Sequence, residues 1–366
     1  MDKNITANIK QGISKYLKSR PSKKEQIFFI KRLSFLISSG LPMLDSLQML
    51  SKQSRSLSHR EIIGSIFEDV SSGKKLSKSF SNFPNMFDKL TVSIIRRGEE
   101  SGTLPQSLDY LADELKKKQE LKRKIIGSLV YPAIITIATI IITVFLVTYL
   151  FPKIMPVFLS LHMSLPLSTR IVIGLSLFMI KWGLLLLFAG LILVGVFIYY
   201  FKRNIKFQKN IHITLLHTPI ISTVIRDYNV SNFTRTLGLL LKSQISLYQG
   251  LSTVAGTTTN LVFRDHFNKM QSVVDRGAQM STYIKEHQYI FPEVVTQMVA
   301  VGERSGNLSD SLIYISEYYE QEIDEFTKNL SGLVEPIMMV FMGIIIGFIA
   351  ISIITPIYSL TQGLHS

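Results

Sequence analysis

Three long apolar runs divide the chain into alternating hydrophobic and polar regions. They cover residues 125–151, 171–201 and 333–358. About 20 apolar residues are enough for a helix to cross the hydrocarbon core of a bilayer, and each run is longer than that. The first run has no charged residue, whereas Lys181 interrupts the second and Glu335 lies near the start of the third. The pattern therefore predicts three transmembrane helices.

The polar regions between these runs have the periodicity of amphipathic helices. Near the start of the first region, Phe29, Leu33 and Ile37 recur at the spacing of one helical face. No stretch alternates between apolar and polar residues for long enough to predict a strand. We therefore predict an all-α integral membrane protein, in which residues 26–124 and 202–332 form two duplicated bundles of about six helices each.

The two polar regions are copies of one unit. The heptapeptide Gly98–Leu104 returns as Gly302–Leu308, with five of its seven residues identical. The offset is 204 residues, the difference between positions 302 and 98, and the alignment needs no gap. A tandem duplication of one large unit explains this better than a short-period repeat. The same offset aligns further pairs, including Phe29 with Phe233, Gly73 with Gly277, Phe87 with Phe291 and Pro132 with Pro336.

The repeated heptapeptide has the features of a corner between two helices. Its two glycines suit tight turns, and Thr103 and Gln106 have the spacing of a capping box at the start of the next helix. Glu99 is expected near the amino terminus of that next helix, where a carboxylate is favoured by about 0.3–1 kcal/mol. We therefore interpret the repeated residues as determinants of the fold in preference to a catalytic site. They are Gly98, Glu99, Ser101, Gly102 and Leu104 in the first copy, and Gly302, Glu303, Ser305, Gly306 and Leu308 in the second.

The distribution of basic residues predicts the orientation in the membrane. Six Lys and Arg residues precede the first apolar run within 116–124, and four follow the second run within 202–209. The loop at 152–170 has two basic residues, and the tail at 359–366 has none. Cytoplasmic flanks of membrane helices are enriched in Lys and Arg. Both bundles and the basic arm at 1–25 are therefore expected in the cytoplasm, and the loop and tail outside it.

Charge also differs between the two copies. The chain has a formal net charge of +14 and no Cys, which excludes disulfides, thiolate metal sites and a Cys nucleophile. Residues 1–124 hold 24 basic and 13 acidic groups, whereas residues 202–332 hold 13 and 12. The basic first copy suits anionic lipid headgroups or an acidic protein partner. Charge alone also allows binding to DNA.

No residue pattern in the sequence points to catalysis. Ser72–Lys75 lacks the first Gly and the final Ser or Thr of a phosphate-binding loop, and no His-Glu-x-x-His zinc motif occurs. The acidic pair Glu99 and Glu100 could hold a hard cation, but capping of a helix is favoured. We therefore predict no enzymatic activity, no catalytic residue, no metal ligand and no cofactor.

Together these features resemble the inner-membrane platform proteins of type II secretion and type IV pilus systems, the type II secretion F and PilC proteins. The resemblance rests on Gly-Glu-x-Ser-Gly-x-Leu in both copies, the three spans, and Glu335-Pro336 at the last span, and it covers about residues 26–360. The first copy has Tyr131-Pro132 at the matching place, so a role for Glu335 does not extend to both halves. The short arm, the length and the composition are similar to the Gram-positive competence member of the family.

The resemblance implies a non-enzymatic platform that couples a hexameric cytoplasmic ATPase to the extraction of pilin subunits. Expected partners are that ATPase, pilins or pseudopilins, membrane lipids and further copies of the chain, in a dimer to tetramer. A small transporter or channel subunit is an alternative, with Lys181 and Glu335 as charges on its path, but an interfacial Lys181 beside Trp182 is favoured. A membrane-tethered DNA-binding protein is a third interpretation, which no recognised motif supports.

Overall fold

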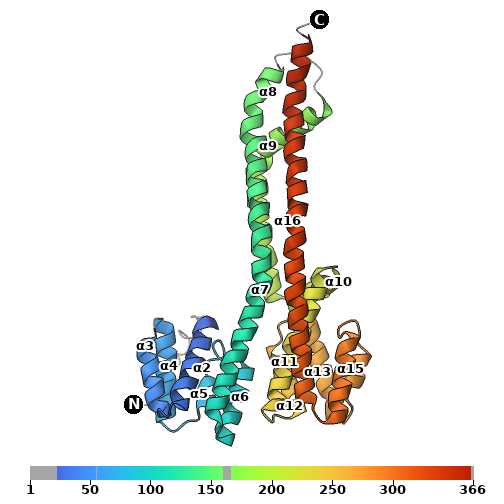
Figure 1. Cartoon of the computed structure of the whole chain (residues 1–366). Coiled ribbons are helices and arrows are strands. Elements are labelled where there is room, and N and C mark those ends of the chain that lie inside the picture. Colours follow the sequence, from blue (N-terminus) through green and yellow to red (C-terminus); the bar gives the residue numbers. More distant parts are fainter. Residues whose placement is uncertain (1–22, 55, 160–165, 364–366) are drawn as a thin grey trace. The chain divides into compact units, whose positions relative to one another are not determined.

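The computed structural model describes residues 23–54, 56–159 and 166–363, and all the regular elements within these ranges are helices (Figure 1). The predicted all-α fold is therefore confirmed for the described residues. Almost all of the predicted basic arm at 1–25 lies outside them, as does the end of the tail predicted at 359–366.

The chain forms two compact units, each built from two separate stretches of sequence. Unit 1 contains residues 1–123 and 209–323, and unit 2 contains residues 124–208 and 324–366. Unit 1 takes in residues 26–123 of the first predicted bundle and residues 209–323 of the second, and α6 contacts α11 and α12 within it. The three apolar runs belong to unit 2.

The helices of unit 1 repeat at the offset that the sequence predicts. Helices α3, α4 and α6 have the same bounds as α12, α13 and α15 after a shift of 204 residues, and α7 and α16 begin at equivalent leucines. The first bundle comprises α2 (Lys23–Ser38), α3 (Met43–Gln53), α4 (Leu57–Ser71), α5 (Leu76–Phe80), α6 (Lys89–Ser101) and the start of α7 (Leu104–Phe145). The second comprises α10 (Ile205–His217), α11 (Ile221–Lys242), α12 (Leu247–Thr257), α13 (Leu261–Asp275), α14 (Met280–Lys285), α15 (Glu293–Ser305) and the start of α16 (Leu308–Gly363).

Stacked phenylalanine rings fill the core of each bundle. In the first bundle Phe80 and Phe87 stack with their ring centroids 3.9 Å apart, and Phe29 lies beside both rings. In the second, Phe233 stacks on Phe267 at 4.5 Å. All five side chains are buried. At the offset of 204, Phe80 aligns with Ile284 and Phe267 aligns with Ile63, so the ring that completes the stack comes from α5 in the first bundle and from α13 in the second.

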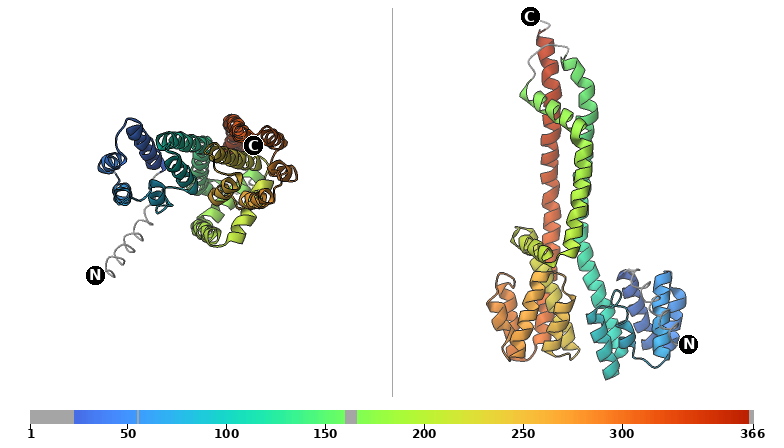
Figure 2. Two further views of the ribbon diagram at one scale, coloured as in Figure 1. Left: turned by 90° about the horizontal axis from the view of Figure 1, so that it is seen from below. Right: turned by 180° about the vertical axis from the view of Figure 1, so that it is seen from behind.

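Unit 2 is built from long helices that lie side by side. Besides the distal parts of α7 and α16, it contains a short π-helical segment η1 (Leu146–Leu150), α8 (Phe151–Leu159) and α9 (Leu167–Arg203). The hydroxyl of Thr139 on α7 contacts the sulfur of Met342 on α16 at 2.8 Å, and α16 runs beside α7 in Figure 1. The view from behind shows α9 beside α16 (Figure 2). The hydroxyl of Thr169 on α9 donates to the backbone oxygen of Ser352 on α16 at 2.8 Å. These contacts join the three long helices.

Three helical stretches within the described residues are long and apolar enough to cross a membrane. They are Leu104–Pro156, Leu167–Arg203 and Leu308–Thr355. Most of their large apolar side chains are exposed, which suits a surface in contact with lipid. The predicted loop at 152–170 is mostly helical where it is described, because α8 continues to Leu159 and α9 begins at Leu167.

Each repeated corner turns at a glycine in the left-handed backbone region. Gly102 is the C-cap of α6, with φ of 71°, and Gly306 is the C-cap of α15, with φ of 72°. The backbone N–H of Thr103 then donates to the oxygen of Gly98 at 2.9 Å, which closes the turn. An added Cβ would meet no atom within 4 Å at Gly102 or Gly306, so a side chain there is resisted by backbone conformation and not by crowding.

We expect Gly102→Val and Gly306→Val each to lower the free energy of unfolding by about 1–3 kcal/mol, because a β-branched residue is strained at this φ. Thermal unfolding of the full-length protein in detergent measures the effect. Gly64→Ala is the matched control, since Gly64 is helical and its added Cβ would lie 3.8 Å from the nearest atom, the Ser51 hydroxyl. An unchanged transition in Gly102→Val would contradict this account of the corner.

Candidate functional site at the junction of the two bundles

The repeated glutamate of each corner caps a short helix that precedes it in the sequence. The carboxylate of Glu99 accepts hydrogen bonds from the backbone N–H groups of Leu76 and Ser77, which begin α5. Glu303 does the same for the first two residues of α14, at 2.6 and 3.2 Å. Our prediction that Glu99 serves the helix after the corner was therefore wrong. The carboxylate satisfies two otherwise unpaired donors of a helix too short to be stable alone.

The first glycine of each corner lets two helices approach closely. A Cβ at Gly98 would lie 2.6 Å from the hydroxyl and 2.8 Å from the Cβ of Ser107, on α7. At Gly302 the corresponding distances to Ser311 on α16 are 2.7 and 2.8 Å. Real Cβ atoms do not approach other atoms this closely, so a larger residue would push the two helices of the corner apart.

The serine of the corner makes different contacts in the two copies. The hydroxyl of Ser101 donates to the oxygen of Arg97 at 2.8 Å and pairs with the hydroxyl of Thr103 at 2.7 Å. In the second copy Ser305 accepts a longer hydrogen bond, 3.4 Å, from the backbone N–H of Asn307. The leucines that follow, Leu104 and Leu308, pack partly buried against the core.

The residues singled out near the spans lie in unit 2. Pro132 is inside α7, and Glu335 and Pro336 are inside α16 with exposed side chains. Lys181 and Trp182 lie on α9, where the ammonium group is 5.7 Å from the centroid of the indole ring.

A buried arginine joins the two bundles. Arg235, on α11, donates from Nη1 to the carboxylate of Glu114 on α7 at 3.0 Å. Its Nε and Nη2 donate to the two carboxylate oxygens of Glu320 on α16, both at 2.8 Å. The side chain of Arg235 is 7% exposed, and that of Glu114 is 9% exposed. Burial alone would lower the pKa of Arg235, but the two carboxylates raise it above its ordinary value, so the charge is kept.

Further polar contacts surround this charge cluster. The guanidinium group of Arg97 on α6 donates to the backbone oxygen of Gln244 at 2.8 Å. Gln244 is a non-glycine residue with φ of 59°, and the first copy has Gly40 at the equivalent position. Lys117 lies 3.9 Å from Glu317, which adds a second ion pair between the bundles. The junction thus combines one buried cluster with exposed contacts around it.

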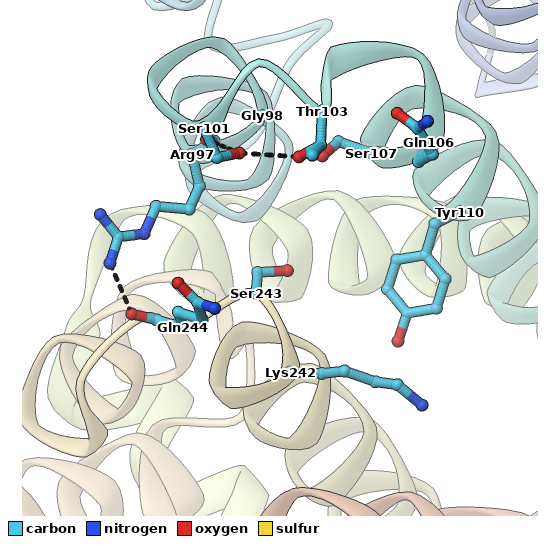
Figure 3. A pocket seen from close by; sticks show the side chains of 10 residues that line it. All are labelled: Arg97, Gly98, Ser101, Thr103, Gln106, Ser107, Tyr110, Lys242, Ser243 and Gln244. Atoms are coloured by element: carbon cyan, nitrogen blue, oxygen red, sulfur yellow. Dashed lines mark hydrogen bonds between the residues drawn. The ribbon is translucent and has the colours of Figure 1, made fainter.

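The first corner lines a cavity of about 460 Å³ at this junction (Figure 3). Figure 3 shows Tyr110 extending from α7 toward the side of the cavity formed by Lys242. The Tyr110 hydroxyl is buried and has no hydrogen-bond partner among the described residues, and burial raises its pKa. The lining residues are Arg97, Gly98, Ser101, Thr103, Gln106, Ser107, Tyr110, Lys242, Ser243 and Gln244.

The second bundle brings two histidines together, His266 and His287. The rings of His266 and His287 lie with centroids 4.8 Å apart, and His266 pairs with the hydroxyl of Tyr283 at 2.9 Å. Burial, together with His287, lowers the pKa of His266 to about 4. Among the described residues no group of three or more His, Asp or Glu side chains is placed to hold a metal ion.

The sequence analysis did not single out Arg235 or its partners. Comparison of the two copies could have pointed to them, because the aligned residues differ. Arg235 aligns with Lys31, and Glu114 aligns with Tyr318. Lys31 is half exposed and pairs with Asp113, which is also half exposed, at 2.9 Å. The exchange of Lys for Arg at an equivalent helical position marks the copy in which this side chain is buried.

Comparison with known families identifies the class of protein. The sequence profile described as "Type II secretion system (T2SS), protein F" matches residues 29–152 and again residues 233–356. The two matches are 204 residues apart, the offset that the corners show. The chain belongs to the type II secretion system protein F family. Its three apolar helices and this membership identify it as a membrane protein.

Named relatives include proteins of both pilus and secretion systems. The chain is 30% identical over 356 residues to "Type IV pilus assembly protein PilC" of Pseudomonas aeruginosa, which covers 96% of this chain and 94% of the relative. It is 30% identical over 344 residues to the PilC of Thermus thermophilus, and the alignment covers 94% of this chain and 84% of the relative. It is equally 30% identical over 341 residues to "Type II secretion system protein F" of Pseudomonas aeruginosa, with 93% and 84% coverage. The family is one of structural platform proteins and is not known for enzymatic activity.

We expect Glu99→Ala to cost about 0.5–2 kcal/mol of stability, the usual effect of removing a side chain that caps a helix. The loss is local, so hydrogen exchange of the Leu76 and Ser77 amides should accelerate more than exchange in α3. Glu100→Ala is the matched control, since Glu100 is exposed and pairs weakly with Arg97 at 3.5 Å. Equal exchange rates in the two variants would show that the Glu99 carboxylate does not hold α5.

We expect Arg235→Ala to lower the free energy of unfolding by about 3–5 kcal/mol, because it leaves two carboxylates facing each other without their cation. Lys31→Ala, at the equivalent position of the first copy, should cost less than about 1 kcal/mol, since its ion pair is exposed. Denaturant unfolding of the full chain in detergent compares the two. Similar losses in both variants would rule out a special role for the buried arginine.

Proposed function

We propose that this chain is the membrane platform on which a type IV pilus, a competence pilus or a type II secretion pseudopilus is assembled. The observation that carries the proposal is the match of the family profile to both copies at one offset. Relatives named for pilus assembly and for secretion align over more than nine-tenths of the chain. Three membrane-crossing helices joined to two helical bundles suit a protein that connects a cytoplasmic machine to subunits in the membrane.

The orientation we propose places both bundles and the arm at 1–25 in the cytoplasm. Its support is the positive-inside distribution, with basic residues flanking the first two spans on the side of the bundles. The segment at 152–170 and the end of α16 then lie outside. In this orientation unit 1 is accessible to a soluble cytoplasmic partner, and unit 2 is accessible to pilin helices within the bilayer.

The partners we propose are a hexameric cytoplasmic ATPase and pilin or pseudopilin subunits. The net charge of the first copy, +11 against +1 for the second, favours an acidic protein surface or anionic lipid beside it. Helices α7 and α16 each begin in a bundle of unit 1 and end in unit 2. Movement imposed on a bundle by the ATPase would pass along these helices to the membrane spans and displace a bound pilin. The platform itself supplies contacts and needs no catalytic residue.

Deletion of the coding sequence should abolish surface filaments or secretion in the source bacterium, and expression of the full chain should restore them. Unimpaired filaments and secretion, together with altered ion or solute flux, would instead support the alternative function of a small transporter or channel subunit. Steeply salt-dependent binding of the purified protein to duplex DNA would support the DNA-binding alternative.

Replacing Lys122, Arg123 and Lys124 by three glycines tests the transmission of movement along α7. Three alanines at the same positions are the control, since both variants lose the same charges and only the glycines weaken the helix, by about 1 kcal/mol per residue. We expect filament assembly to fail with glycine and to be retained with alanine, at equal protein levels in the membrane. Equal assembly in the two variants would show that helical continuity at this point is not needed.

A further inference from the structure

The two bundles have equivalent folds but bury different faces. In the second bundle, α11 packs against α6 and α7 of the first, which buries Arg235, Thr236 and Leu239. The equivalent positions on α2 are Lys31, Arg32 and Phe35, and all three are exposed. Phe35 is 69% exposed, whereas Leu239 is 2% exposed. Among the described residues, none covers on α2 the face that α11 uses for docking.

The surface formed by α6 and α7 is likewise buried in the first bundle, whereas the equivalent surface of α15 and α16 in the second bundle is exposed. On the first bundle, Leu90 of α6 and Glu114 of α7 are buried at the junction. Their equivalents on the second bundle are Val294 of α15, which is 44% exposed, and Tyr318 of α16, which is 39% exposed. Each chain thus has one docked pair of faces and one undocked pair, and the undocked faces are equivalent to the docked ones.

We propose that the exposed face of α2 and α3 in one chain docks on the exposed face of α15 and α16 in a second copy of the chain. The contact would repeat between two chains the arrangement that α11 and α12 make with α6 and α7 within one chain. We call the first surface the cationic face, formed by Phe28, Lys31, Arg32, Phe35 and Lys52. The second is the acidic face, formed by Glu293, Val294, Tyr314, Tyr318 and Glu322.

The chemistry of the two faces is complementary. The cationic face combines two exposed phenylalanines with three basic side chains, of which Lys31 also pairs with Asp113. The acidic face combines two tyrosines and a valine with two carboxylates. Apolar rings meeting within a rim of opposite charges are the composition of a stable protein interface. Two cationic faces would instead bring like charges together, which disfavours a symmetric contact between identical surfaces.

One pair of positions makes this complementarity specific. Within the chain, Lys89 of α6 contacts α12, where a Cβ added at Gly256 would lie 3.1 Å from the lysine Nζ. The equivalent positions on the undocked faces are Glu293 and Lys52. A contact between two chains with the geometry of the internal junction therefore places a carboxylate opposite an ammonium group. The duplication has introduced opposite charges where the internal contact has one charge and a glycine.

This arrangement has a consequence for assembly in a membrane. A contact between two different faces is heterologous. A pair of chains joined in this way therefore still has one cationic face and one acidic face free. Repetition of the contact gives a closed ring or an open row of chains, in which bundles of the first and second kind alternate.

The absence of Cys from the chain makes the contact directly testable. Two forms with different epitope tags are expressed together, one carrying Lys52→Cys and the other Glu293→Cys, and isolated membranes are treated with a short bis-maleimide. We expect a cross-linked product that contains both tags. Lys89→Cys with Gly256→Cys in a single chain is the positive control, because it reports the internal contact with the same reagent.

Three outcomes would overturn the proposal. A product joining two Lys52→Cys chains, in place of the mixed product, would mean that α2 faces meet each other. No mixed product, with the internal control fully cross-linked, would mean that another partner or lipid covers these faces. Charge reversal gives an independent check: Lys52→Glu should reduce native association of the detergent-solubilised chains several-fold, and Glu293→Lys in the same chain should restore it. If the second change does not restore association, the two residues do not face each other.

Discussion

A buried positive charge, that of Arg235, joins the two bundles within one chain. Arg235 lies between Glu114 of the first copy and Glu320 of the second, and the guanidinium and Glu114 side chains are almost completely inaccessible. A buried ion pair is not in itself a strong source of stability, because removing the charges from water costs several kcal/mol. Its effect is to specify the partner. Only a surface that supplies carboxylates in this geometry can cover α11, so the junction selects one register of the two bundles.

The duplication explains how such a junction arises without a new fold. Both copies keep the same signals for the backbone: a left-handed glycine at the end of α6 and α15, a glycine that allows close helix contact, and a glutamate that caps the preceding short helix. Surface positions are free to diverge around this shared frame. In one copy the side chain on α11 is an arginine that becomes buried, and in the other the equivalent lysine stays in solvent.

Much of this fold can be predicted from the sequence, because local signals determine it. The apolar runs predict the three spans by length alone, and the offset of 204 residues predicts the helices of the second bundle once those of the first are known. Gly102 and Gly306 are predictable as corner residues, since a glycine after an amphipathic helix favours the left-handed conformation. The family follows from the same motif and was confirmed by the match to both copies.

Contacts between distant parts of the chain could not be predicted in the same way. Glu99 binds backbone groups 22 and 23 residues earlier, and sequence spacing favours the nearer helix after the corner. Arg235 is 121 residues from Glu114, so its burial depends on how the finished bundles meet. The segment at 152–159, predicted as part of a loop between two spans, is helical in α8, with Pro152 in the first turn and Pro156 inside the helix. Each of these features is decided by packing and not by local propensity.

The most direct test of the account is a double-mutant cycle between Arg235 and Glu114, with Arg235→Met and Glu114→Gln, measured by denaturant unfolding of the full chain. If the buried pair ties the two copies together, the coupling energy should be at least about 1 kcal/mol, as for residues in one charged network. The same cycle between Lys31 and Asp113 should give less than about 0.5 kcal/mol, since that pair is exposed. Additive effects of Arg235→Met and Glu114→Gln, within about 0.3 kcal/mol, would contradict the claim that this interaction joins the two bundles.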